Sequence, residues 1–275
     1  MAGTEDYLYR VKFIKPAQLS LLLPSLSPSQ VFLEAINEKP EMMLSSGSEW
    51  HLGNVDFFDQ LTGSFAIGRT TKTTLEKFDK ESGNFIDQLD DSSPYTTVVF
   101  DCRIGLLGIA KKSKLAPDAE TVARRIRGLF EKSETVIHTG SEVKVNFIPD
   151  PQGFIQKLRA AYAIKSFKAT FTGPNPVDAD ELFQKPLSVY AQQIGAQTGS
   201  LEVKGEALNE EVAESIAKST AATANTASAR IIPAEGKKVV PIRMKGDAVS
   251  VVVSLDASYR DVLARIQDEY SRVRG

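Results

Sequence analysis

Short runs in which apolar and polar residues alternate recur along this chain, and segments with helical spacing lie between them. Residues 143–147 and 167–171 alternate in this way, which is typical of strands with one buried face. Residues 152–162 and 256–273 instead place apolar side chains three or four positions apart, which predicts amphipathic helices. Both periods in one chain favour sheets covered by helices. We therefore expect an α+β fold, with mixed β-sheets and helices mainly on one face.

The pattern is clear from residue 95 onward and weak before it. Residues 41–95 are polar and glycine-containing, with one strand-like run at residues 64–68. This composition is typical of loops. We predict a loop-rich N-terminal region over residues 1–94 and an α+β body over residues 95–275.

Within the predicted body, residues 95–101 and 104–111 are apolar runs close enough to pair as a hairpin. Residues 143–171 have the order strand, helix, strand, whose size suits a crossover onto one sheet. A similar order of elements in residues 95–176 and 200–275 leaves open a division of the body into two similar halves.

Cysteine and histidine are too scarce for several kinds of chemistry. Cys102 is the only cysteine, which excludes a disulfide framework and a zinc site built on thiolates. His51 and His138 are the only histidines, so a site with several histidine ligands cannot form within one chain. Packing or surface roles are favoured for all three residues. We expect no metal and no cofactor.

Sequence motifs exclude further classes. The chain has no phosphate-binding loop, no dinucleotide-binding glycine turn and no nucleophile elbow. It also has no apolar run of the roughly 20 residues that span a membrane, and its acidic N-terminus lacks the pattern of a signal peptide. We expect a cytoplasmic protein that contacts no membrane and has no catalytic activity.

The charge is unevenly distributed. Residues 111–168 contain 12 Lys and Arg against six Asp and Glu, whereas residues 1–110 contain nine against 15. A basic segment of this kind binds phosphates where its side chains share one face, although it is also typical of solvated helix faces. The candidate nucleic-acid-binding residues are Lys111, Lys112, Lys114, Arg124, Arg125, Arg127, Lys157 and Arg159.

Four strings, SPYT at residues 93–96, IGLLGIAKKSKL at 104–115, FIPD at 147–150 and TGPNP at 172–176, carry a resemblance. With them the chain resembles a family of uncharacterised bacterial proteins that are often encoded near mobile elements and phage-defence genes. The resemblance implies a role in defence against phage or plasmids and implies no catalytic residues. The expected function is a non-enzymatic subunit of such a system that binds nucleic acid or another defence protein through its basic central region; whether it forms an oligomer is left open.

Two alternatives come from other classes. A metal-dependent nuclease needs carboxylates on adjacent strands and a nearby lysine, and Asp101, Glu142 and Lys144 have these residue types. Glu and Lys also alternate on the exposed face of any half-buried strand, which is the simpler interpretation. The second alternative is a structural assembly subunit.

Overall fold

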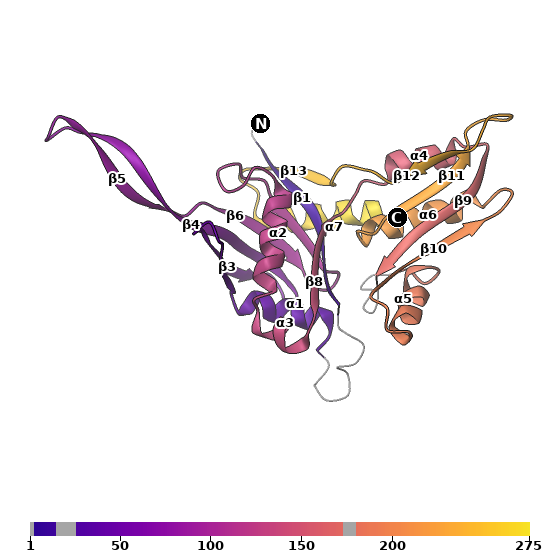
Figure 1. Ribbon diagram of the computed structural model, residues 1–275, viewed down its shortest axis with the longest axis horizontal. Helices are drawn as coiled ribbons and strands as arrows, with labels where there is room; N and C mark the ends of the chain where they lie inside the picture. Colours follow the sequence, from indigo (N-terminus) through magenta and orange to yellow (C-terminus); the bar gives the residue numbers. More distant parts are fainter. Residues whose placement is uncertain (1–2, 15–25, 173–179) are drawn as a thin grey trace.

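A computed structural model describes residues 3–14, 26–172 and 180–275 (Figure 1). It has the mixed α+β fold that the two sequence periods predict. Residues 173–176, which belong to one of the strings that carry the resemblance, lie outside the described residues. Within the described part of the chain, no helix is both long and apolar enough to cross a membrane.

A nine-stranded antiparallel sheet forms the larger layer of the molecule. Its central order is β13–β1–β7–β6–β4–β3–β2, with β8 paired to β1 and β5 to β4. The strands are β1 (Gly3–Ile14), β2 (Glu41–Met43), β3 (Glu49–Phe57), β4 (Thr62–Asp79), β5 (Asn84–Ser92), β6 (Tyr95–Asp101), β7 (Leu106–Ala110), β8 (Glu142–Phe147) and β13 (Ser250–Ser254). The predicted hairpin of residues 95–111 is confirmed as β6 and β7.

A four-stranded antiparallel sheet forms the second layer, in the order β10–β9–β11–β12. Its strands are β9 (Ala163–Thr172), β10 (Thr198–Lys204), β11 (Ala227–Ile232) and β12 (Val240–Arg243). The predicted crossover of residues 143–171 onto one sheet is therefore wrong, because β8 belongs to the larger sheet and β9 to the smaller one. Alternation identifies a strand and its buried face, but it does not identify the strand's partner.

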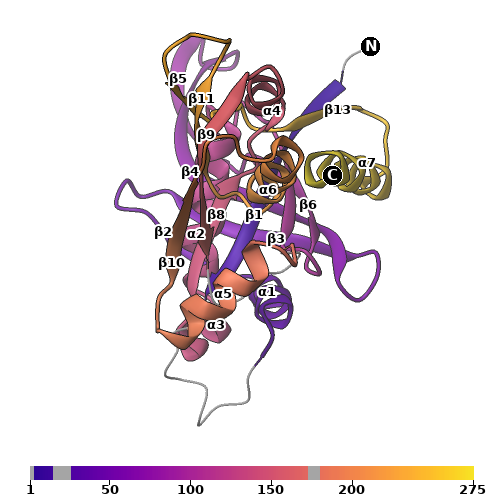
Figure 2. The same cartoon turned by 90° about the vertical axis from the view of Figure 1, so that its right-hand side faces the viewer.

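Helices cover both faces of the larger sheet and one face of the smaller sheet (Figures 1 and 2). On the larger sheet, Tyr9 and Val11 pack on the side of α1, α2 and α3, while Leu8 packs on the side of α7. The helices of this sheet are α1 (Pro28–Asn37), α2 (Ala119–Phe130), α3 (Glu134–Thr139) and α7 (Tyr259–Arg274). Those of the smaller sheet are α4 (Gln152–Arg159), α5 (Gln184–Gln193) and α6 (Glu210–Ala222).

The expectation of a loop-rich N-terminal region is wrong. Strands β2 to β5 occupy most of residues 41–92, and β4 and β5 continue as a long hairpin away from the sheet (Figure 1). A boundary at residues 94 and 95 would cut through the larger sheet, because β4 pairs with β6 and β1 with β7. The two predicted halves do not form separate units either, since each contributes strands to both sheets.

Candidate nucleic-acid interface

A cavity of about 650 Å³ lies between α2 and the edge of the smaller sheet. Its walls come from distant parts of the chain: Arg124 and Arg127 from α2, Phe147 from β8, and Thr226 and Lys245 from the segments beside β11 and β12. Two of the cationic residues predicted from the sequence, Arg124 and Arg127, therefore face a real hollow.

Helical periodicity explains why these two arginines share a side of α2. Val122, Ile126 and Leu129 are buried against the larger sheet, and Arg124 and Arg127 lie three positions apart on an exposed side. Arg124 donates a hydrogen bond to the Thr121 hydroxyl (2.9 Å), and Arg127 lies 3.4 Å from the Glu131 carboxylate. Exposed contacts of this kind are weak, so both guanidinium groups remain available to a ligand.

A second hollow of about 420 Å³ continues from the first along the outer face of the smaller sheet. Lys168, Thr170 and Arg243 line it, and it shares Lys245 with the first hollow. Strand register fixes the spacing, because Ser228 pairs with Lys168 on one side and with Arg243 on the other. Two inter-strand steps place these cations about 10 Å apart on one face.

We call the two joined hollows the basic groove, and define it by five exposed cationic residues: Arg124, Arg127, Lys168, Arg243 and Lys245. Of the five, only Arg127 forms an ion pair with a described carboxylate. Phe147 adds an aromatic surface to this groove, because its side chain is 41% exposed there. The groove thus combines cations on two walls with one accessible aromatic ring and one exposed carboxylate, that of Glu120.

The other predicted cationic residues lie elsewhere. Arg125 turns toward β3, where its guanidinium carbon is 5.7 Å from the centroid of the Trp50 ring. Arg159 on α4 forms two hydrogen bonds of 2.7 Å with the Glu214 carboxylate, so it is already engaged, and Lys157 is exposed on the same helix. Because α2 packs on the larger sheet and α4 on the smaller one, the predicted cationic residues of the two helices do not share one face.

Lys111, Lys112 and Lys114 are exposed in the segment that follows β7. Lys112 is engaged with an aromatic ring, since its Nζ lies 4.6 Å from the centroid of Tyr95. Lys111 and Lys112 line a further hollow on the face of the larger sheet that α7 partly covers, so they are not part of the basic groove.

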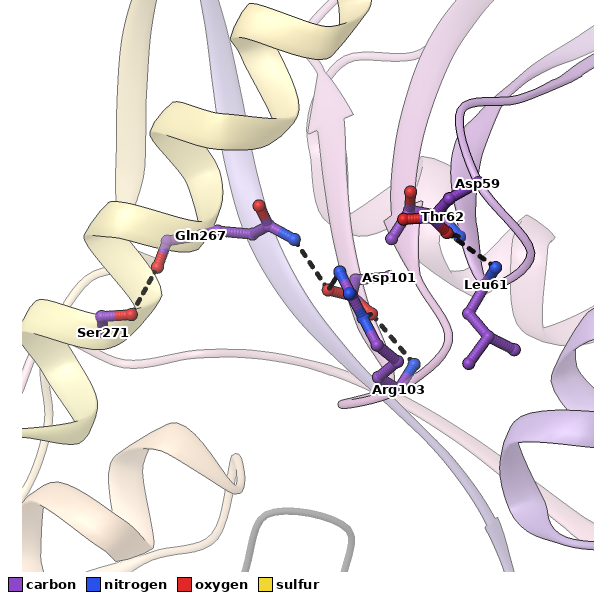
Figure 3. Close-up of polar contacts among 7 residues, drawn as sticks. All are labelled: Asp59, Leu61, Thr62, Asp101, Arg103, Gln267 and Ser271. Atoms are coloured by element: carbon purple, nitrogen blue, oxygen red, sulfur yellow. Dashed lines mark hydrogen bonds and ion pairs between the residues drawn. The ribbon is translucent and has the colours of Figure 1, made fainter.

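Asp101, the first residue of the alternative nuclease site, is a buried structural carboxylate (Figure 3). It accepts hydrogen bonds from the Arg103 side chain (2.9 and 2.8 Å) and from Gln267 of α7 (2.7 Å). Nearby, the Asp59 carboxylate accepts from the backbone N–H groups of Leu61 and Thr62. Asp101 therefore ties the end of β6 to α7.

Glu142 and Lys144 do not join Asp101. They lie on β8, 3.4 Å from each other, and β1 and β7 separate β8 from the strand of Asp101. Three inter-strand steps correspond to about 14 Å, which is too far for carboxylates that share a metal ion. The three predicted nuclease residues thus form no common site.

One group in the described residues has metal-ligating side chains close together: Glu41, Glu49 and His51. His51 lies 3.4 Å from Glu41 and 3.7 Å from Glu49 across β2 and β3. An exposed group of this kind is explained by charge pairing on neighbouring strands.

His138 lies in α3 and contacts the Glu134 carbonyl, and Cys102 is buried, which raises its pKa. The structure brings neither residue to the groove.

Comparisons with known protein families and with curated proteins gave no match for this chain. Of the groove residues, Arg124 and Arg127 are predicted from the sequence, whereas Phe147, Arg243 and Lys245 are not. Residues 241–245, with the sequence PIRMK, alternate in polarity, and this signal places Arg243 and Lys245 on one side of an extended segment. The approach of this segment to α2 depends on tertiary structure and leaves no local signal.

Proposed function

We propose that this protein binds single-stranded nucleic acid in the basic groove, as a non-enzymatic subunit of a bacterial system that defends against phage or plasmids. The observation that carries the binding proposal is the convergence on one groove of five exposed cations, two from α2 and three from the smaller sheet and the segment after β12. Cations on two walls follow a phosphate backbone and give affinity without sequence readout. The defence context rests on the sequence resemblance.

Phe147 favours a single strand over a duplex as the ligand. Its exposed ring lies at the groove, where an unpaired base can stack on it. Bases in a duplex are already stacked and cannot use this ring. We therefore expect single-stranded DNA or RNA to bind more tightly than the duplex of the same sequence.

A salt titration of binding tests the proposal. The groove variant carries Arg124→Ser, Arg127→Ser, Arg243→Ser and Lys245→Ser, and its matched control carries Lys80→Ser, Lys132→Ser, Lys157→Ser and Lys238→Ser, which are exposed and outside the groove. Each lost phosphate contact should lower the slope of log K against log salt by about 0.7 for a single strand, hence by about 3 for the groove variant. The control variant should keep most of the wild-type slope.

The variant Phe147→Ala separates stacking from charge. It should weaken single-strand binding by about 1–3 kcal/mol and leave the salt slope unchanged, because it removes no cation. The proposal fails if the wild-type protein binds neither DNA nor RNA at low salt, or if both quadruple variants lose affinity equally. In that case the groove is better explained as a docking face for another protein of the defence system, which is the other partner that the sequence analysis expects.

A further inference from the structure

A separate hollow of about 440 Å³ lies beside the first turn of α7. It is on the face of the larger sheet that α7 covers, opposite the face that α2 covers. Small side chains on β7 create it. Asp6 of β1 pairs with Ala110, and Val98 pairs with Ile109, which places Thr97 of β6 on the other side of Ala110. The methyl group of Ala110 leaves space between Asp6 and Thr97, and Val262 of α7 forms part of the wall.

Asp6 in this hollow is buried without a partner. The residue is only 5% exposed, and no described side chain donates a hydrogen bond to its carboxylate or forms an ion pair with it. Burial alone raises its pKa to about 6. Asp101, on the same face of the sheet, is also buried but has Arg103 and Gln267 as donors. A buried carboxylate without donors is unfavourable, and the hollow is the side from which donors can reach it.

Away from Asp6, the hollow is bordered by aromatic rings and by amines. Tyr95 and Tyr259 are 49% and 50% exposed at its rim, and Thr97 donates a hydrogen bond to the Tyr259 hydroxyl (3.3 Å). Lys111 and Lys112 line the same rim; Lys112 Nζ lies over the Tyr95 ring, and neither lysine forms an ion pair with a described carboxylate there. A simple cation would be repelled by these amines. A ligand that fits has N–H donors at one end, a flat ring in the middle and an anion at the other end.

We propose that this hollow binds a guanine nucleotide, with the base edge on Asp6, the ring beside Tyr95 and Tyr259, and the phosphate near Lys111 and Lys112. The two oxygens of a carboxylate accept only, and guanine presents two adjacent N–H donors on its Watson–Crick edge. Adenine and cytosine place a ring acceptor beside their amino group, and uracil places carbonyl oxygens on both sides of its N–H. Each of these edges turns at least one acceptor toward the carboxylate.

Calorimetric titration at pH 8, where Asp6 is ionised, tests the proposal with GMP, AMP, CMP and UMP. We expect GMP to bind at least about tenfold more tightly than the other three, since each hydrogen bond to a charged group contributes substantially to discrimination. Asp6→Asn should remove this preference. Asp87→Asn, an exposed substitution with the same charge change on the β4–β5 hairpin, should keep it.

Two further measurements assign the ends of the ligand. Lys111→Ser should weaken GMP binding but leave guanosine binding unchanged, because guanosine has no phosphate. The groove variant of the preceding section should bind GMP as the wild type does, so that failure of one proposal is separable from failure of the other. Equal affinity for all four nucleotides, no GMP binding, or an unchanged GMP preference in Asp6→Asn would overturn the assignment.

Discussion

Two buried aspartates on one face of the larger sheet show how far an environment decides the state of a side chain. Asp101 accepts from Arg103 and Gln267, so its charge is balanced by donors. Asp6 has burial as the only cause of its shifted pKa. In the sequence both are acidic residues next to strand-like runs, and nothing local shows which one has donors. Asp101 is accordingly a candidate metal ligand by its sequence position, and Asp6 is not.

The raised pKa of Asp6 predicts a pH effect on stability. The carboxyl group titrates near 3.8 in the unfolded chain and near 6 in the folded protein. Between these values the folded state holds a proton that the unfolded state has released, so this group stabilises the fold below pH 4 and that contribution is lost as the pH rises through 6. Asp6→Asn should therefore be more stable than the wild type at pH 7, by up to about 3 kcal/mol.

Urea denaturation of the wild type and Asp6→Asn at pH 4, 5, 6 and 7 measures this difference directly. The gap between the two proteins should widen with pH and level off above pH 6. A gap that does not change with pH would show that Asp6 is not the unpartnered group described above.

Residue-level prediction of the groove succeeded only where one element decided the outcome. The helical period of α2 is sufficient to place Arg124 and Arg127 on one side. The same period turns Arg125 by about 100° from Arg124, and it meets Trp50 instead. Treating the three arginines as one basic cluster ignored that rotation.

At the scale of elements, strand β3 of the N-terminal region was missed because its alternation is interrupted. In β3, Trp50 and Leu52 are buried, but the register with β4 then shifts between Gly53 and Asp56, and Asn54 has a positive φ of 48°. A bulge of this kind breaks the two-residue period, and polar turn-forming residues within it indicate a loop. The helices were recognised more fully because their period continues without interruption for at least two turns. The predicted helix of residues 256–273, for example, is confirmed as α7.

Close packing of α7 on β7 yields a test at this scale. A Cβ at Gly108 would overlap the Ile266 side chain and lie 2.9 Å from Val99 Cγ2. Gly108→Ala should therefore destabilise the protein by about 1–3 kcal/mol through overpacking. Gly153→Ala is the matched control, because its Cβ would meet nothing within 4 Å in α4. It should raise stability by about 0.5–1 kcal/mol. Thermal unfolding of both variants measures these changes. If Gly108→Ala leaves the stability unchanged, α7 does not pack on β7 as closely as the structure shows.

For the whole molecule, a shared core joins the two sheets. Leu8 and Leu106 of the larger sheet belong to one hydrophobic cluster with Phe167 of the smaller sheet and Ile266 of α7. The basic groove has one wall from each sheet, so this junction sets its width. Sequence analysis divided the chain near residue 95, whereas folding joins β1 to β13 across almost its full length. Local patterns contain no information about such long-range pairing.

Lys12 lies at this junction and links the sheets by hydrogen bonds. Its Nζ donates to Thr172 of the smaller sheet (3.3 Å) and to the Asn225 side chain (3.1 Å). Burial lowers its pKa to about 7, and the neighbouring positive charges of Arg10 and Lys144 act in the same direction. A neutral amine still donates a hydrogen bond, so the contacts persist when the proton is lost.

The lowered pKa of Lys12 predicts that the junction gains stability with rising pH. Between pH 7 and 10 the unfolded chain holds a proton on Lys12 that the folded protein has released, so the wild type should become more stable relative to Lys12→Met, by at most about 1.4 kcal/mol per pH unit. Lys132→Met, at an exposed position, should track the wild type throughout. Urea denaturation at pH 7, 8 and 9 measures the three proteins. If the difference in unfolding free energy between wild type and Lys12→Met is the same at all three pH values, the Lys12 ammonium is not desolvated where the two sheets meet.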